Sequence, residues 1–75
     1  MLNNDLKEIR RKNKISQQEL ADAILTTRQT IYAIENGKSV PSLELALKIA
    51  SFFNLSVERI FQLKGQQKTD LFTVF

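Results

Sequence analysis

The sequence has no cysteine and no histidine, and only one proline and two glycines. Without cysteine the chain can form neither a disulfide nor a thiolate metal site. Without histidine it lacks the commonest general base and the commonest transition-metal ligand. Glycine is too scarce for a phosphate-binding loop, and the acidic residues form no convergent cluster. We therefore expect no enzyme activity, no catalytic residue, no metal site and no cofactor.

Long apolar runs are also missing from the sequence. No run approaches the roughly 20 residues that span a bilayer, and the first residues lack the basic-then-apolar order of a signal peptide. These absences predict a cytoplasmic protein without a membrane partner. Eleven Lys and Arg against eight Asp and Glu give a formal net charge of +3, which permits a polyanionic partner without requiring one.

What the sequence does contain indicates one small globular domain. Its 75 residues are 43% hydrophobic and 25% charged. A capping box at Ser16–Glu19 and the pair Pro41-Ser42 mark two helix starts, and Asn36-Gly37 marks a helix end. The predicted fold class is all-α. The bundle has five short helices, at about residues 5–13, 17–24, 28–35, 43–53 and 57–61.

The last residues differ in composition from the helical part. Residues 64–68 are polar and turn-like, whereas residues 69–75 are rich in β-branched and aromatic side chains. We expect a domain over residues 1–64 and a C-terminal tail over residues 65–75. The tail is either a short strand, which we favour, or an unstructured extension. A strand would pair with Leu63 or with Met1-Leu2, giving a small β-element at the chain termini.

The fourth predicted helix carries two apolar stripes at helical spacing. The first stripe consists of Leu43, Ala46, Leu47, Ala50 and Phe53. The second stripe consists of Leu45, Ile49 and Phe52. Each apolar stripe needs a neighbouring element that covers it. Either both stripes bury against helices of the same chain, or the second stripe partly faces another subunit.

Two of the predicted helices, 17–24 and 28–35, are separated by a three-residue turn, which is the arrangement of a helix-turn-helix. The second of them begins with Thr27-Arg28-Gln29-Thr30. In the major groove of DNA, arginine makes bidentate hydrogen bonds with guanine, and glutamine makes them with adenine. This segment is therefore either a base-reading helix start or simply a solvated helix N-terminus.

Four sequence blocks extend this interpretation. They are Ser16 to Ala21, Arg28 to Ile31, Ile34 to Lys38, and Pro41 to Leu43. With the four blocks in register, the chain from about Leu6 to Phe61 resembles the phage repressor and Cro-type (XRE-like) helix-turn-helix regulators, in their short stand-alone form. The resemblance implies a homodimer that binds a near-palindromic operator in double-stranded DNA and usually represses transcription.

The resemblance also implies roles for individual residues. Base reading falls to Thr27, Arg28 and Gln29, and Ala33 can offer only an apolar contact, for example with a thymine methyl group. Contacts with the DNA backbone fall to Gln17, Thr26, Thr30, Tyr32, Asn36, Lys38 and Ser39. Gln17 and Tyr32 are also explained as ordinary surface residues. The basic run of Arg11, Lys12 and Lys14 either helps to steer DNA or is a solvated face.

Two further positions concern the structure of the motif. Arg10 and Glu35 match residues that in this family form a buried or half-buried ion pair between the first and third helices. We interpret Glu35 as structural, because an acid beside phosphate would oppose DNA binding. Leu25 departs from the family, which commonly has glycine at a turn that often needs a left-handed backbone. A non-glycine residue there costs about 1–2 kcal/mol.

The apolar residues that follow the motif predict a dimer surface. It consists of Val57, Ile60, Phe61 and Leu63, with support from Leu71 and Phe72 in the tail. The alternative is that Ile60 and Phe61 complete the core of the monomer. A second class of function also stays open, an antitoxin-like module that binds a protein partner through the hydrophobic segment 71–75.

Overall fold

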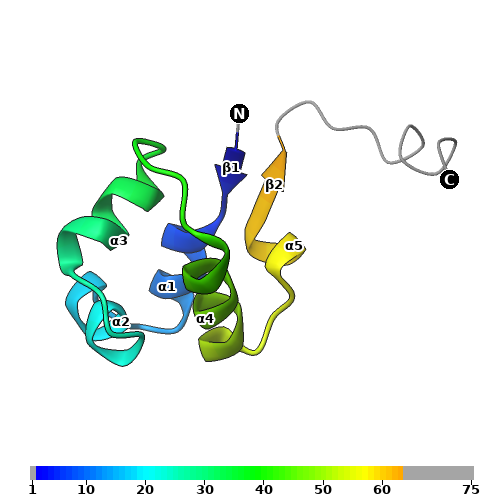
Figure 1. Ribbon diagram of the computed structural model, residues 1–75. Coiled ribbons are helices and arrows are strands. Elements are labelled where there is room, and N and C mark those ends of the chain that lie inside the picture. The colour runs from blue at the N-terminus through cyan, green and yellow to red at the C-terminus, as the bar shows by residue number, and fades with distance from the viewer. Residues whose placement is uncertain (1, 64–75) are drawn as a thin grey trace, which may run out of the picture.

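The computed structural model describes residues 2–63, which form five helices and two short strands (Figure 1). In chain order these are β1 (Leu2–Asn4), α1 (Leu6–Lys12), α2 (Gln17–Ala23), α3 (Arg28–Glu35), α4 (Leu43–Phe53), α5 (Val57–Ile60) and β2 (Phe61–Leu63). The predicted helical bundle with a small β-element is confirmed. The predicted strand in the tail, with Leu71 and Phe72, lies outside the described residues.

The β-element joins the start of the chain to the segment after α5. β1 and β2 are antiparallel, and Leu2, Asn3 and Asn4 are paired with Leu63, Gln62 and Phe61. The prediction that the fifth helix includes Phe61 is therefore wrong. Phe61 has extended φ and ψ angles of −121° and 130° because its backbone belongs to β2. The backbone N–H of Asp5 also donates to the Ile60 carbonyl at 2.9 Å, which fixes the start of α1 against α5.

All five helices contribute to a single hydrophobic core. Its largest fully buried side chains are Leu6, Leu20, Ile31, Ile34, Ile49 and Ile60. Full burial of one such side chain stabilises a fold by about 1.5–3 kcal/mol. Helix α3 packs on the core through Ile31 and Ile34, which lie on one face of the helix. The opposite face of α3 is accessible to solvent.

The core of the single chain covers only part of each of the two predicted apolar stripes on helix α4. Its buried residues are Ala46, Ile49 and Ala50, which come from both stripes. Leu43 and Leu47 of the first stripe are 75% and 52% exposed, and Phe52 of the second is 41% exposed. The core covers one side of this helix, so each stripe keeps part of its apolar surface uncovered within the single chain.

Helices α1 to α4 end in the same way. Near each end one residue takes a left-handed φ, and the next residue donates its N–H to the carbonyl five residues back, which is the Schellman arrangement. These donor–acceptor pairs are Ile15–Arg10, Thr26–Ala21, Lys38–Ala33 and Leu55–Ala50. The left-handed residues are Lys14, Leu25, Gly37 and Asn54, with φ of 56°, 61°, 71° and 56°.

The turn at Leu25 gives a testable prediction. Leu25 is left-handed and 85% exposed, so its side chain adds backbone strain while it buries little apolar surface. We expect Leu25→Gly to raise the free energy of unfolding by about 1 kcal/mol, which is the relief of strain less the added freedom of the unfolded chain. Urea denaturation measures the change.

Val40 provides the matched control for that measurement. It is also exposed, at 72%, and it is not among the positive-φ residues of the described chain. Val40→Gly should therefore lower stability, because glycine at a negative φ only gains freedom in the unfolded state. Equal effects of the two glycine substitutions would contradict the strain at Leu25.

Candidate nucleic-acid interface

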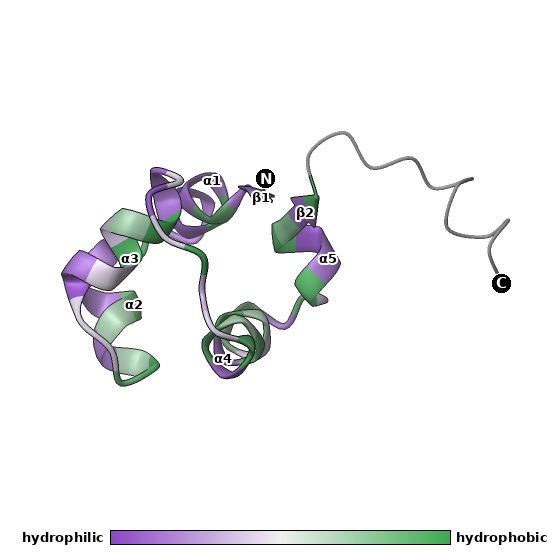
Figure 2. Ribbon diagram, turned by 45° about the horizontal axis from the view of Figure 1, so that its top comes forward, coloured by the Kyte–Doolittle hydropathy of each residue, from purple (hydrophilic) through white to green (hydrophobic). Residues whose placement is uncertain are grey.

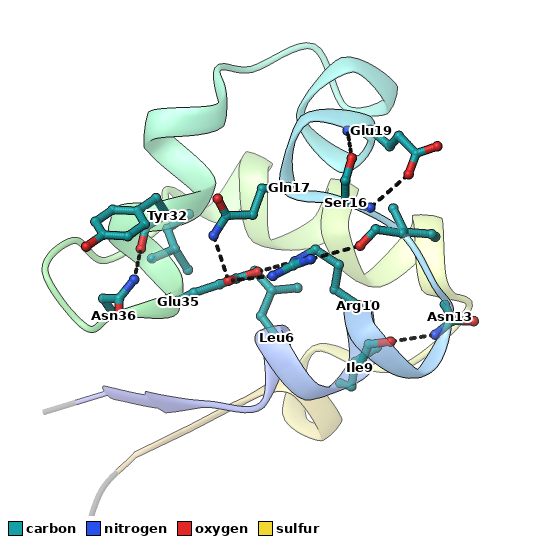
Figure 3. Close-up of polar contacts among 12 residues, drawn as sticks. Leu6, Ile9, Arg10, Asn13, Ser16, Gln17, Glu19, Tyr32, Glu35 and Asn36 are labelled. Atoms are coloured by element: carbon teal, nitrogen blue, oxygen red, sulfur yellow. Dashed lines mark hydrogen bonds and ion pairs between the residues drawn. The ribbon is translucent and has the colours of Figure 1, made fainter.

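Helix α2 begins with a complete capping box at Ser16 and Glu19 (Figure 3). The Ser16 Oγ accepts a hydrogen bond from the Glu19 backbone N–H at 3.0 Å, and a Glu19 carboxylate oxygen accepts one from the Ser16 N–H at 2.8 Å. This reciprocal pair satisfies two backbone donors at the start of the helix. The first helix of the motif therefore starts where the sequence predicted.

The start of α3 is organised by two threonines. Thr27 is the N-cap, and its Oγ1 accepts from the Thr30 backbone N–H at 3.2 Å. The two threonine hydroxyl oxygens also lie 2.9 Å apart in a side-chain hydrogen bond. Arg28 and Gln29 are exposed and have no side-chain hydrogen bond within residues 2–63. These two side chains, at the N-terminal end of α3, are thus free to contact a ligand.

Arg10 and Glu35 form an ion pair between α1 and α3. The Arg10 Nε donates to Glu35 Oε2 at 2.6 Å, and Nη2 donates to Oε1 at 3.1 Å (Figure 3). The side chains are 10% and 0% exposed. The Arg10 Nη1 also donates to the Ile15 carbonyl at 2.9 Å, so one guanidinium connects α1, α3 and the loop before α2. This geometry is the bidentate arrangement that gives an ion pair directional strength.

The ion pair changes the ionisation of Arg10. The hydrogen bond donated to Glu35 raises the pKa of the guanidinium, and burial offsets part of this increase. A charged arginine whose pKa is raised in the folded state stabilises the fold at every pH below the ordinary pKa of arginine. The contribution is lost only as the pH rises through the folded-state value. Arg10 is therefore charged throughout the physiological range.

Gln17 lies at the first position of α2 and is half-buried. Its Nε2 donates to Glu35 Oε1 at 3.1 Å, so the amide extends the Arg10–Glu35 pair to a third helix (Figure 3). A hydrogen bond to Glu35 uses one of the two donors of this amide. The sequence reading did not include this contact, and the predicted contact of Gln17 with a phosphate remains a prediction.

The residues at the end of α3 and after it contact one another. The Asn36 Nδ2 donates to the Tyr32 carbonyl at 2.8 Å (Figure 3), and the Lys38 ammonium lies 5.7 Å from the centroid of the Tyr32 ring. Tyr32 is 47% exposed, and Asn36, Lys38 and Ser39 are exposed as well. A cation at this distance from an aromatic ring is attracted to its face. Four of the predicted backbone-contact residues, Tyr32, Asn36, Lys38 and Ser39, therefore lie in the last two turns of α3 or just after it.

A comparison with protein families identifies this arrangement. The helix-turn-helix family model matches residues 6–60, which include all five helices. The chain belongs to the helix-turn-helix family. This finding confirms the resemblance drawn from the four sequence blocks.

Relatives of this helix-turn-helix protein occur in bacteria and archaea. Sixty residues are 48% identical to an uncharacterised HTH-type transcriptional regulator of Methanocaldococcus jannaschii, covering 80% of this chain and 91% of that protein. Sixty-five residues are 44% identical to the uncharacterised HTH-type transcriptional regulator YgzD of Bacillus subtilis, covering 87% and 98%. The helix-turn-helix chain is thus a DNA-binding transcriptional regulator and not an enzyme.

A solved structure shows the same fold. A crystal structure of a protein from Bacteroides fragilis matches the helix-turn-helix chain with a TM-score of 0.75, covering 83% of this chain and all of that one. The sequence identity is 24%, so this likeness concerns the fold alone. In residues 2–63 no helix is long and apolar enough to cross a membrane, and no group of acidic side chains could hold a metal ion.

The residues predicted for the dimer surface of the helix-turn-helix protein fall into two groups. Ile60 and Phe61 are 0% and 7% exposed, and both belong to the core of the single chain. They are therefore not available to a second subunit, because α5 and β2 turn them toward the other helices. Val57 is half-buried, and Leu63 is 60% exposed.

Sequence reasoning missed one contact that positions α3. The Asn4 Nδ2 donates to the Ile34 carbonyl at 2.9 Å, and the Asn4 Oδ1 accepts from the Leu6 N–H at 3.1 Å. Asn4 thus joins β1, the start of α1 and the last turn of α3. Thirty residues separate Asn4 from Ile34, and no local spacing signals a contact over that distance.

Proposed function

We propose that this chain is a repressor that binds a near-palindromic operator as a homodimer, with α3 in the major groove of each half-site. The observation that carries this proposal is the two-sided character of α3. Ile31 and Ile34 are 0% and 1% exposed on the core side, while Arg28 and Gln29 are exposed and free of side-chain partners within residues 2–63. Folding alone does not require such a pair at this position.

The chemistry of the exposed face suits the edges of base pairs. Arg28 matches the two acceptors of guanine, and Gln29 matches the donor and acceptor of adenine. By helical periodicity, Tyr32 and Ala33 lie on the same outward side as Gln29, away from Ile31 and Ile34. Ala33 would contact only an apolar group such as a thymine methyl. Thr27 occupies the N-cap beside them, and its hydroxyl is already bonded to Thr30.

Residues at both ends of the motif would hold the DNA backbone. Gln17 and Thr26 are half-buried before α3, and Asn36, Lys38 and Ser39 are exposed after it. Thr30 is half-buried and bonded to Thr27. Contacts of this kind fix the register of a protein on the duplex, whereas base contacts determine its sequence preference.

A dimer is part of the proposal because one recognition helix reads only a few base pairs. In a two-fold dimer the recognition helices lie about 34–36 Å apart, on half-sites one turn of DNA apart. Val57 and Leu63 support a subunit contact, since both keep apolar surface that the single chain does not cover. Leu43 and Leu47 of α4 also keep exposed apolar surface. A dimer on a promoter represses by excluding polymerase.

The test is the selection of bound duplexes from a random-sequence pool, at one near-physiological salt concentration. Salt must be fixed because contacts to phosphate weaken steeply as it rises. We expect enrichment of a two-fold symmetric motif with half-site centres about 10–10.5 base pairs apart. Enrichment of a single half-site would contradict the dimer, and no enrichment would contradict sequence-specific binding.

Arg28→Ala is selected in parallel as the variant that tests the base contact. If Arg28 reads a guanine, the variant loses the preference at one base pair of each half-site, and affinity for the wild-type site falls by about 1–3 kcal/mol. If Arg28 contacts only phosphate, all sequences weaken together and the motif is unchanged. The second outcome would remove Arg28 from the base-reading residues.

A further inference from the structure

Helix α1 is mostly hydrophilic (Figure 2), and only Leu6 and Arg10 of this helix are buried. Its two remaining flanks face different neighbours. On one flank, Asp5, Ile9 and Lys12 line an open hollow together with Glu58, Arg59 and Gln62 of the α5–β2 segment. The buried Arg10 reaches across to Glu35 of α3. Helix α3 and the α5–β2 segment lie on opposite sides of α1 (Figure 1), so the flank away from the hollow borders the helix-turn-helix.

Three basic residues lie along α1 or just after it, and none of them lines the hollow beside α5. Lys7 and Arg11 are four residues apart in α1, so they share one side of the helix, away from Ile9 and Lys12. Lys14 lies beyond the end of α1, in the turn before α2, with a φ of 56°. All three are exposed. We call these three residues the basic edge. The sequence reading grouped Lys12 with Arg11 and Lys14, but Lys12 belongs to the hollow beside α5.

The charges of the basic edge are not neutralised by ion pairs within the described chain. Among residues 2–63 the ion pairs are Arg10–Glu35 and Lys48–Glu44. Glu8 is the acidic residue of α1 itself, and it lines the hollow on the α5 side. The Glu35 carboxylate of α3 is already paired with Arg10. The basic edge therefore presents its charge to solvent.

The ends of the basic edge are fixed beside the two parts of the proposed DNA interface. Near Lys7, Asn4 is bonded to the Ile34 carbonyl in the last turn of α3, close to Asn36 and Lys38. Near Lys14, Arg10 is bonded to the Ile15 carbonyl, immediately before α2 and Gln17. The chain beside each end of the basic edge is thus tied to the motif, through the Asn4 contact with α3 and the Arg10 contact with the residue before Ser16.

We propose that the basic edge is an accessory binding surface for the phosphodiester backbone of duplex DNA that flanks each half-site. The inference rests on the proposed function, because it needs α3 in the major groove to bring DNA to this side of α1. The partner follows from charge, because three exposed cations without an ion pair among residues 2–63 suit the phosphates of a duplex. Such contacts add affinity and salt dependence but no base preference.

The test compares two triple variants with the same net charge. The edge variant is Lys7→Gln, Arg11→Gln and Lys14→Gln, and the control variant is Lys12→Gln, Lys48→Gln and Arg59→Gln. Each removes three of the positive charges, so the formal net charge of +3 becomes zero in both. The control residues lie in the hollow beside α5 and in the Lys48–Glu44 pair of α4. Thermal unfolding checks that both variants remain folded.

The measured quantity is the slope of log affinity against log salt concentration. It is recorded on the selected site and on a duplex of random sequence. Each lost phosphate contact reduces the slope by about 0.9, so the edge variant should lose about 2–3 and the control variant much less. The motif selected from the random pool should be the same for the edge variant as for the wild type.

Two results would overturn the inference. One is an edge variant with the wild-type slope, which would mean that the basic edge does not touch DNA. The other is an equal loss of slope in both variants, which would mean that only net charge matters. Failure of the proposed function is seen separately, as a wild type that selects no motif, and the random duplex then still measures whether the basic edge binds phosphate.

Discussion

Arg10→Met is expected to lower the free energy of unfolding by about 3–5 kcal/mol, because it leaves a buried carboxylate without its cation. The Glu35 side chain is 0% exposed, and the remaining side-chain partner in the described chain is the amide of Gln17 at 3.1 Å. A single amide donor replaces neither the charge nor the second hydrogen bond of the guanidinium. Since small domains have about 5–15 kcal/mol of stability, this loss is a large share of the total.

The double variant Arg10→Met with Glu35→Leu separates the cost of an unpaired charge from the value of the pair. Replacing both partners of a buried ion pair by apolar residues is often neutral or stabilising. We therefore expect the double variant to recover most of the stability lost in Arg10→Met. Chemical denaturation of the wild type and the two variants measures both differences. A double variant as unstable as the single one would mean that the pair itself contributes the stability.

The ion pair also illustrates what could be predicted from the sequence. Local signals predicted the helices, because the Ser16–Glu19 box, the Ser42 cap and the Gly37 stop each depend on neighbouring residues. The register of four blocks then implied the family and, through it, the Arg10–Glu35 pair. The structure adds the bidentate geometry and the link to Gln17, which depend on how three helices meet.

Burial was predicted less well than helix position. Helical spacing gives the faces of α4, but it does not say which face the rest of the chain covers. Leu43 and Leu47 share a predicted stripe with Ala46 and Ala50, yet only the two alanines are buried. Large apolar residues in α4 therefore remain exposed while Ile60, predicted for the dimer surface, is fully buried. The order of residues along the chain does not fix these neighbours.

The backbone conformation of Leu25 was predicted from the family resemblance and not from helical spacing. The family resemblance implied that Leu25 stands in a turn that often needs a left-handed residue, and the structure has Leu25 at a φ of 61°. The strain is tolerated because the hydrogen bond from Thr26 to Ala21, at 2.9 Å, closes the end of α2 in the same way as in the other three helices. A left-handed leucine thus closes the end of α2 at the position where the family commonly has glycine.

Ile60→Ala is expected to lower the free energy of unfolding by about 2–5 kcal/mol, because the truncated side chain leaves a cavity in the core. Ile60 is 0% exposed and packs in the same cluster as Leu6 and Ile49. A core residue acts within one chain, so the loss should be the same at every protein concentration. The stability contributed by a subunit contact, in contrast, rises with concentration.

Leu63 is the matched comparison for Ile60, because it lies three residues later and is 60% exposed. Leu63→Ala should change the stability of the single chain by less than about 1 kcal/mol, and it should weaken self-association if the proposed dimer uses this surface. Thermal unfolding and sedimentation, each over a range of protein concentrations, measure the two effects. If Ile60→Ala weakened only self-association and left the single chain equally stable, Ile60 would belong to the subunit surface and not to the core. The two substitutions together therefore decide which apolar residues after α4 hold one chain together and which remain for a second copy.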